Sequence, residues 1–371
     1  MHLGATEDQQ AIQHAAREFL AKEITRERRR RWDDEPAGWD AAFRDAVAGL
    51  GWLGYGLPRA HGGEGASLLD LGLLVEECGR AATPLGVFAA IAGGLGVAAL
   101  GTAAQQRAWL PALARGEKRV TLAVAEATAT EPAAFATTVR RRGRDVVVDG
   151  EKRYVLQGVD ADGFLVAARD RGGLSVVLVP AGARGVTVVP QQAFGKERQS
   201  IVRLRGVRLP ATAVGASPGR AAAALGRLKL RLAALLAADM VGGADAVLDM
   251  TVRYVAEREQ FGVKLGTFQA VQQMVASMAI ALEGARHVTR QALWRLAEGL
   301  DAEREVAIAK AWTGRAYTEI TLLAHQLHGG AGYVVEHDLH RYSARAKAAE
   351  LRLGSPEEWL ATLADGLKLA R

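Results

Sequence analysis

The first third of the chain carries the apolar pattern of amphipathic helices. Between residues 7 and 116, apolar side chains recur every three or four positions, as in the run Leu68, Leu71, Leu74, Val75 and Cys78. This spacing places the apolar side chains on one face of an α-helix. We therefore predict several helices in this segment, separated by glycine-rich turns such as residues 51–65.

The middle of the chain, from residue 119 to about 215, shows the pattern of β-strands instead. The runs 146–148, 175–179 and 186–189 are rich in β-branched residues, and their period is close to two. Residues of this type fit a pleated sheet. Two dipeptides, Asp149-Gly150 and Gly172-Gly173, predict turns between these strands.

From residue 217 to the end, the helical pattern returns in longer elements. One helix is predicted from about residue 218 to 257, and the pair Gly242-Gly243 inside it permits close helix packing or a kink. A second helix is predicted from Asp301, as the N-cap, to Leu327, with Gly329-Gly330 as the stop.

The order of these segments predicts an α+β protein. We expect three domains: a helical domain at residues 1–118, a β domain at 119–215 and a helical bundle at 216–371. A chain of 371 residues, 49% hydrophobic and 24% charged, has enough apolar residues to bury a large core in several such units.

Composition also predicts the compartment. The longest apolar run, residues 87–100, is interrupted by glycines and is shorter than the roughly 20 residues that a membrane-spanning helix needs. The first ten residues contain no apolar segment typical of an export signal. Cys78 is the only cysteine, which excludes an internal disulfide and a zinc site built from cysteines. We therefore predict a cytoplasmic protein with no membrane partner.

The net charge of +6 raises the question of a nucleic-acid partner. Residues 26–31 contain five arginines, but Glu27 interrupts the run and Trp32 is the only aromatic residue beside it. This composition is typical of a solvated helix face or a salt-bridge surface, so we predict no nucleic-acid partner. A basic surface also suits a phosphorylated ligand such as coenzyme A.

Two motifs in the last third of the chain carry the strongest chemical signal. A planar guanidinium donates two hydrogen bonds at once to a pyrophosphate, which suits Arg258. Glycines at 329 and 330 let the backbone lie against phosphate or ribose. These features permit a nucleotide ligand without requiring one. The first motif comprises Arg258, Gln260, Phe261, Gly262, Phe268 and Gln269, and the second comprises Gln326, Gly329, Gly330, Gly332 and Tyr333.

Together, the two motifs resemble the flavin-contacting signatures of the acyl-CoA dehydrogenase family. The resemblance extends to the α, β, α order over nearly the whole chain. It implies an N-terminal helical domain, a central β-barrel-like domain and a C-terminal four-helix bundle, assembled as a tetramer around FAD. The activity it implies, in lipid metabolism, is α,β-desaturation of an acyl-CoA thioester. In that reaction a glutamate removes the α-proton, and the β-hydrogen leaves as hydride to the flavin.

The family's catalytic glutamate is absent from both of its usual positions. Counting from Gln326 places one position on Leu353, and counting back from Arg258 places the other on Leu232. A neutral aliphatic side chain cannot accept a proton. The resemblance therefore implies a chain without its own base.

The side chains that surround the flavin ring in the family are missing too. The family's Thr-Glu-Pro triplet, with a Gly-Ser-Asp turn after it, aligns with Ala125-Glu126-Ala127. The alternative register Thr130-Glu131-Pro132 recovers the triplet but still lacks that turn. Tyr154 and Leu156 stand where the family has Trp and Thr.

The motifs that remain are those that, in the family, reach the ADP half of a flavin held by the neighbouring subunit. We therefore hypothesise a subunit of a heteromeric acyl-CoA dehydrogenase, which completes the FAD site of a second, catalytically competent chain. The implied substrate is an acyl-CoA thioester, and the implied electron acceptor is an electron-transfer flavoprotein. The residues expected to contact FAD are Arg258, Gln260, Phe261, Gln269, Gln326, Gly329 and Gly330.

Two other hypotheses remain open. A self-sufficient homo-oligomer could use a displaced base, with Glu350 as the first candidate, Glu357 as the second, and Glu126 and Asp239 after them. A flavin-dependent oxygenase or a flavin-free acyl-binding module could use the same scaffold, because a fold does not fix a function.

Two further patterns have structural explanations. The pairs His325/His328 and His337/His340 have a spacing that can suit a metal ion, but no carboxylate cluster accompanies them, so we predict no metal site. Residues 94–99 approximate a dinucleotide fingerprint without a preceding strand, and they predict helix packing instead.

Overall fold

The computed structural model describes residue 4, residues 6–127 and residues 134–368. The chain divides into two compact units, and each unit is assembled from segments that are distant in the sequence. Unit 1 combines residues 1–24, 67–83 and 230–371, and unit 2 combines residues 25–66 and 84–229. The predicted domain boundaries at residues 118 and 215 stay a prediction.

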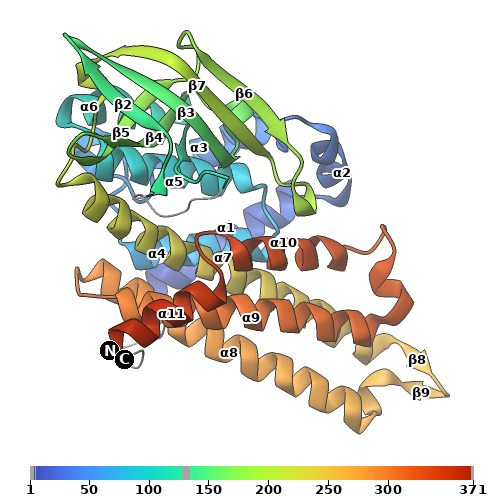
Figure 1. Cartoon of the computed structure of the whole chain (residues 1–371). Helices are drawn as coiled ribbons and strands as arrows, with labels where there is room; N and C mark the ends of the chain where they lie inside the picture. Colours follow the sequence, from blue (N-terminus) through green and yellow to red (C-terminus); the bar gives the residue numbers. More distant parts are fainter. Residues whose placement is uncertain (1–3, 5, 128–133, 369–371) are drawn as a thin grey trace. The chain divides into compact units, whose positions relative to one another are not determined.

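Unit 1 is helical, and a small hairpin projects from the end of its long helices (Figure 1). The predicted helix at 218–257 is observed as α7, most of which lies in this unit, and the one at 301–327 as α9. The elements are α1 (Glu7–Glu23), α4 (Leu68–Arg80), α7 (Ala221–Glu257), β8 (Glu259–Gln260), β9 (Val263–Lys264), α8 (Gln269–Ala297), α9 (Glu303–His328), the 3-10 helix η8 (Gly329–Tyr333), α10 (Leu339–Leu351) and α11 (Pro356–Gly366).

The start of α9 differs from the prediction. The N-cap is Ala302 and not Asp301, and the side chain of Ala302 makes no capping hydrogen bond. The Asp301 carboxylate still accepts a 3.3 Å hydrogen bond from the backbone N–H of Glu303. Asp301 therefore satisfies one free N–H of the first turn, although it precedes the N-cap by one residue.

α7 packs tightly against its neighbours at the pair Gly242-Gly243, as predicted. A Cβ atom on Gly242 would collide with the backbone carbonyl of Glu76 in α4, and one on Gly243 would collide with the Tyr317 hydroxyl of α9. α7 is one continuous helix through this pair. The glycines therefore allow close packing within a continuous helix.

Unit 2 combines a β-sheet with shorter helices, and together the two units confirm the predicted α, β, α order and the α+β class. The strand order is β1-β4-β2-β3-β7-β6, and β5 pairs with β4. β1 runs parallel to β4, whereas β3 is antiparallel to both β2 and β7. The elements are α2 (Arg26–Asp34), α3 (Ala41–Gly49), α5 (Leu85–Leu100), α6 (Ala103–Ala114), β1 (Val120–Ala123), β2 (Thr138–Arg142), β3 (Asp145–Leu156), β4 (Gly163–Asp170), β5 (Gly173–Pro180), β6 (Val186–Gln191) and β7 (Gln199–Pro210).

The three predicted strand segments lie in β3, β5 and β6, and valines from several strands form the buried core of the sheet. The turn predicted at Gly172-Gly173 is confirmed, because β4 ends and β5 begins there with Asp170 opposite Gly173. The turn predicted at Asp149-Gly150 is wrong. β3 continues through this dipeptide. Gly150 has a φ of 149°, and the pairing of β3 with β7 is irregular between Val148 and Gly150.

Two other sequence features of unit 2 have structural explanations. The glycine-rich run at 94–99 lies inside α5, where Gly96 faces Leu122 and Leu165 of the sheet, so the prediction of helix packing is confirmed. The arginine-rich run forms α2, and the guanidinium of Arg28 donates hydrogen bonds of 3.0 and 2.8 Å to Asp40.

No helix in the ranges that the structure covers is long and apolar enough to cross a membrane. The cytoplasmic location stays a prediction.

Candidate functional site

The hairpin of β8 and β9 presents the first motif on a tight turn. The two strands pair in antiparallel register, and Phe261 and Gly262 between them have φ angles of 57° and 78°. Two consecutive residues with positive φ are typical of the type I′ turn of two-residue hairpins. Asparagine or glycine adopts this backbone conformation more easily than phenylalanine does. The turn therefore holds an aromatic ring at a position where it costs conformational energy.

The side chains of the first motif are exposed. Phe261 exposes 90% of its surface, and Arg258, Gln260 and Gln269 are exposed as well. Gln260 donates a hydrogen bond to the neighbouring backbone carbonyl of Glu259. Within the described ranges, the side chains of Arg258 and Gln269 have no hydrogen bond or ion pair. They are available to a ligand from outside the chain.

The second motif lies at the C-terminal end of α9. The helix ends at His328, and Gly329 takes φ 55° and ψ −140°, a conformation that glycine alone adopts without strain. Gln326, Gly329 and Gly330 are exposed. A Cβ atom added at either glycine would have no atom within 4 Å. The backbone at this helix end is therefore open to a ligand.

Tyr254 and His328 connect the two motifs. Tyr254 lies on α7 one turn before Arg258, and His328 directly precedes Gly329. Their rings stack with centroids 4.2 Å apart and planes at 22°, and the Tyr254 hydroxyl donates a 3.4 Å hydrogen bond to the backbone carbonyl of His328. These two residues are 74 positions apart in the chain. Tyr254 is absent from the sequence-predicted site; its position one helical turn before Arg258 is the signal that could have indicated it.

Leu353, which the resemblance predicts to occupy one position of the family's base, lies in the turn between α10 and α11. Leu353 and Gly354 have φ angles of 61° and 113°. Lys310 of α9 holds this turn, because its ammonium donates hydrogen bonds to the backbone carbonyls of Ala349, Glu350 and Gly354 at 3.0, 2.8 and 3.1 Å. The three donors of the ammonium are thereby satisfied.

Lys310 is fully buried, and this burial lowers its pKa to about 7. Sequence reasoning missed this residue. The available signal is a lysine flanked by Ala309 and Ala311 on an otherwise apolar stretch of α9. A lysine in such a place is almost never buried without a specific partner.

Leu232, which the resemblance predicts to occupy the other position of the base, is 2% exposed inside α7. Neither of these two positions therefore carries a group that can accept a proton.

Glu350, the first candidate for a displaced base, is a buried residue of α10. Its Oε2 atom accepts 2.9 Å hydrogen bonds from the Thr318 hydroxyl and from the Lys347 ammonium. A proton transfer to this oxygen would have to displace one of these donors. Through its bond from Thr318, the Oε2 atom of Glu350 links α10 to α9.

The other acidic candidates of unit 1 also have partners. Asp239 is 1% exposed and binds the guanidinium of Arg345 through both of its oxygens. Glu357 lies in the first turn of α11 and pairs with Arg315 at 3.1 Å. Hydrogen bonds from its own backbone N–H and from Arg315 lower the pKa of Glu357.

Glu126 belongs to unit 2, where it forms a buried pair with Lys152. Its carboxylate accepts a 2.7 Å hydrogen bond from the Lys152 ammonium and further bonds from the backbone N–H groups of Ala136 and Thr137. Burial alone would raise the pKa of Glu126, but the hydrogen bonds from Lys152 and Thr137 lower it to about 2. A carboxylate this acidic is a weak base, so its contacts favour a structural role.

The residues aligned with the flavin-ring contacts lie on and beside a bulge in β3. The register with β7 shifts between Lys152 and Val155, and Tyr154 takes a φ of 57° with half of its surface exposed. Leu156 and Ala125 have no hydroxyl to offer a ring. The alternative triplet Thr130-Glu131-Pro132 lies outside the described residues.

The histidines near the end of α9 pack against other side chains. His325 donates from Nε2 to the Ser343 hydroxyl at 2.6 Å, because that hydroxyl itself donates to a backbone carbonyl. Burial and the neighbouring His337 and His325 lower the pKa of His328 to about 4. Among the residues with described positions, no group of three or more His, Cys, Asp or Glu side chains could hold a metal ion.

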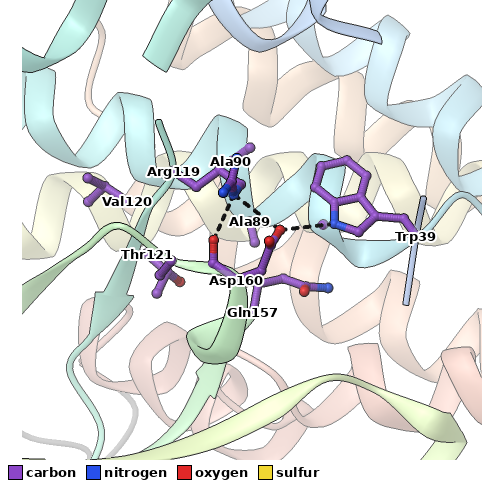
Figure 2. Close-up of a pocket in the computed structure, with 10 residues that line it drawn as sticks. Trp39, Ala89, Ala90, Arg119, Val120, Thr121, Gln157 and Asp160 are labelled. Carbon is purple, nitrogen blue, oxygen red and sulfur yellow. Dashed lines mark hydrogen bonds and ion pairs between the residues drawn. The ribbon is translucent and has the colours of Figure 1, made fainter. Parts of the chain in front are cut away.

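A small cavity in unit 2 lies between α5, β1 and the segment that follows β3 (Figure 2). The Asp160 carboxylate at its edge accepts hydrogen bonds from Trp39 and Arg44 and pairs with Arg119. The cavity volume is about 10 Å³, which is room for about one water molecule. It cannot hold a nucleotide or an acyl chain.

Models of one protein family match the three parts of the chain. They are described as the N-terminal, middle and C-terminal domains of acyl-CoA dehydrogenase, and they match residues 6–117, 121–206 and 224–368.

Individual relatives match over nearly their full length. The cyclohex-1-ene-1-carbonyl-CoA dehydrogenase of Geobacter metallireducens is 31% identical, over 94% of this chain and 95% of its own length. The solved Tcur3481-Tcur3483 steroid ACAD matches with a TM-score of 0.90 and 31% identity, over 99% of each chain. The ChsE4-ChsE5 complex of Mycobacterium tuberculosis matches with a TM-score of 0.92 and 26% identity, over 100% of each chain.

Proposed function

Because this chain belongs to the acyl-CoA dehydrogenase family, whose members are FAD-dependent oxidoreductases, we propose that it is the subunit of a heteromeric enzyme that completes a partner's FAD site. The partner chain carries the catalytic base, and this chain contributes residues that bind the ADP half of the partner's flavin. The reaction served is α,β-desaturation of an acyl-CoA thioester, with an electron-transfer flavoprotein as the electron acceptor.

The observation that carries the proposal is the contrast between the two halves of a flavin site. The side chains of Arg258, Gln269 and Gln326 are exposed and, in the described chain, make no hydrogen bond. Leu156 and Leu353 stand where the family has a flavin-ring hydroxyl and a base. The residues present therefore fit the ADP half of FAD, and they do not fit the ring half.

Each residue proposed to bind the ADP half of the partner's FAD has a specific physical role. The guanidinium of Arg258 can pair with a diphosphate, and Phe261 offers an apolar face to an adenine or ribose. The exposed backbone at Gly329 and Gly330 lets a sugar or phosphate approach without a clash. When bound at the partner's site, FAD supplies the acceptor for the hydride. The proton acceptor must come from the partner, because a leucine cannot take a proton.

The related structures support a heteromer. The Tcur3481-Tcur3483 and ChsE4-ChsE5 assemblies each carry two component names, and both match this chain over at least 99% of its length. A self-sufficient homo-oligomer with Glu350 as its base has less support, since the Glu350 carboxylate is held by Thr318 and Lys347.

Flavin absorbance tests the proposal. The chain is purified alone and also after co-expression with the acyl-CoA dehydrogenase-like chain encoded nearest to it. We expect no flavin on the lone chain and about one FAD per pair of chains in the complex. Stoichiometric flavin on the lone chain would refute the heteromeric reading and turn attention to Glu350.

A matched pair of variants locates the contact. Arg258→Ala removes a guanidinium from the surface proposed to bind ADP. Arg253→Ala removes an exposed arginine of α7, five residues earlier, whose guanidinium pairs with Asp249. We expect the first variant to release FAD from the complex and the second to retain it. Equal FAD retention by both variants would contradict the proposed role of Arg258.

A further inference from the structure

The ends of α7 and α9 are joined by a contact between two aromatic rings. Tyr254 stacks on His328 with ring centroids 4.2 Å apart. His337 contacts the His328 ring edge-on, with centroids 4.7 Å apart and planes at 64°. His328 is 3% exposed, and among the described atoms neither of its ring nitrogens has a hydrogen-bond partner. The imidazole therefore acts as a flat packing surface, a role that suits its neutral form.

Tyr254 is tied directly to the hairpin. The backbone N–H of Arg258 donates a 2.8 Å hydrogen bond to the Tyr254 carbonyl, and the N–H of Leu265 donates a 2.9 Å bond to the Arg258 carbonyl. The base of the hairpin is thereby fixed to the last turn of α7. A displacement of Tyr254 would move Arg258 with it.

His328 is tied in the same way to the second motif. Its carbonyl accepts the hydrogen bond from the Tyr254 hydroxyl, and the next residue is Gly329, whose N–H donates back to the His325 carbonyl. The direction in which the backbone leaves α9 is therefore set at the residue that stacks on Tyr254. The placement of the exposed Gly329 and Gly330 depends on that direction.

We propose that Tyr254 and His328 are positioning residues that couple the hairpin to the end of α9. The two segments then bind the ADP group of a partner's flavin as one preformed surface. This inference rests on the proposed function. A ligand that contacts two segments binds more tightly when their relative placement is already fixed, because less conformational freedom is lost on binding. The Tyr254–His328 contact is the described ring stack that joins the two segments.

Hydrogen exchange on the full chain without flavin tests the coupling itself. His328→Ala removes a ring from α9, and Tyr254→Leu removes one from α7. We expect each variant to raise amide exchange at least tenfold in both segments, the hairpin at residues 259–264 and the helix end at 329–333. His328→Phe retains a flat ring, and we expect it to keep the wild-type exchange of the hairpin.

The decisive observation is whether a substitution in α9 changes amide exchange in the hairpin that follows α7. If His328→Ala raises exchange only at residues 329–333 and leaves the hairpin unchanged, the coupling is refuted. Arg253→Ala serves as the control on α7. Should Tyr254→Leu fail to fold, Tyr254→Phe removes only the hydroxyl, and together with His328→Ala it still decides the outcome. In that case we expect a smaller rise, again in both segments.

FAD affinity of the complex separates this inference from the proposed function. We expect His328→Ala to weaken FAD binding at least tenfold and His328→Phe to restore most of it. If Arg258→Ala has no effect on FAD affinity, the proposed function fails. If Arg258→Ala weakens binding but His328→Ala and Tyr254→Leu do not, only the coupling fails.

Discussion

Phe261 lies edge-on to Phe268, with ring centroids 6.3 Å apart and planes at 84°. Phe268 precedes the first residue of α8, so the exposed ring at the tip of the hairpin is supported by a ring at the start of a helix. An edge-to-face contact of this kind contributes roughly 0.5–1.5 kcal/mol. It orients a side chain that otherwise makes few contacts within the chain.

Phe261→Asn should separate folding from flavin binding. Asparagine adopts positive φ more easily than phenylalanine, and the ring is almost fully exposed, so we expect the free energy of unfolding to change by less than about 1 kcal/mol. FAD affinity of the complex should fall about tenfold or more, because the apolar platform is lost. Urea unfolding and flavin titration measure the two effects. An unchanged flavin affinity would exclude contact between Phe261 and the cofactor.

Gly329→Ala and Gly330→Ala form a matched pair. A new Cβ atom meets no neighbour at either position, but only Gly329 has a positive φ. We expect Gly329→Ala to lower the free energy of unfolding by about 1–3 kcal/mol and Gly330→Ala to leave it nearly unchanged. Chemical denaturation of both variants checks this difference. Equal stabilities would mean that the helix end relaxes without cost.

Introducing a glutamate at the two usual base positions should have unequal effects. Leu353 is partly exposed, so we expect Leu353→Glu to fold with a loss of about 1 kcal/mol or less. Leu232 is 2% exposed, and an unpaired carboxylate there should cost at least about 3 kcal/mol. Thermal unfolding of Leu353→Glu and Leu232→Glu measures this difference in stability.

Leu353→Glu also tests the missing ring contacts. We expect the lone variant to show no acyl-CoA desaturation, because Ala125 and Leu156 still provide no hydroxyl for a flavin ring. Desaturation by this variant alone would show that the chain holds a complete flavin site and lacks only the base.

Lys310→Met should change how stability depends on pH. Burial lowers the pKa of Lys310 from 10.5 to about 7, so between these values the unfolded chain binds more protons than the folded one. The free energy of unfolding therefore rises with pH across this window, by at most about 1.4 kcal/mol per pH unit. The three carbonyl acceptors favour the ammonium and therefore oppose the lowering of the Lys310 pKa. We expect Lys310→Met to lack this contribution between pH 7 and 10.5, which unfolding curves at several pH values would measure.

The loss of the ammonium also leaves three carbonyls at the end of α10 without a donor. We expect faster amide exchange at residues 351–355 in Lys310→Met. Lys22→Met, which removes an exposed lysine of α1, is the control and should leave this turn unchanged. Equal pH slopes for Lys310→Met and the wild type would mean that Lys310 stays charged throughout.

His328→Phe should remove a stability change at lower pH. Burial lowers the pKa of His328 from 6.5 to about 4, so the unfolded chain binds more protons between these values, and stability falls as the pH drops through this window. The contribution is at most about 3 kcal/mol. The difference between wild type and His328→Phe, measured by unfolding from pH 4 to 7, isolates it from the carboxylates that titrate nearby. The absence of any difference would show that His328 can be protonated within the stack.

Much of the fold could be predicted because its signals are local. The helices around Leu71 and the strands at 146–148 and 175–179 each follow from the period of their own apolar residues. The turn at Asp149-Gly150 failed as a prediction for the complementary reason. A dipeptide signals a turn, but pairing of β3 with β7 over many residues outweighs that preference and converts it into an irregularity within a strand.

The sequence by itself determined that the two positions aligned with the family's base carry no proton acceptor, because a leucine at 353 or 232 cannot accept a proton in any fold. It also determined the motif residues that could meet a nucleotide, because a guanidinium and paired glycines carry those properties wherever they lie. Only the tertiary structure decided that Tyr254 stacks on His328 and that Lys310 holds the end of α10. These contacts join residues tens of positions apart, and their energies depend on burial and distance, which no local pattern records.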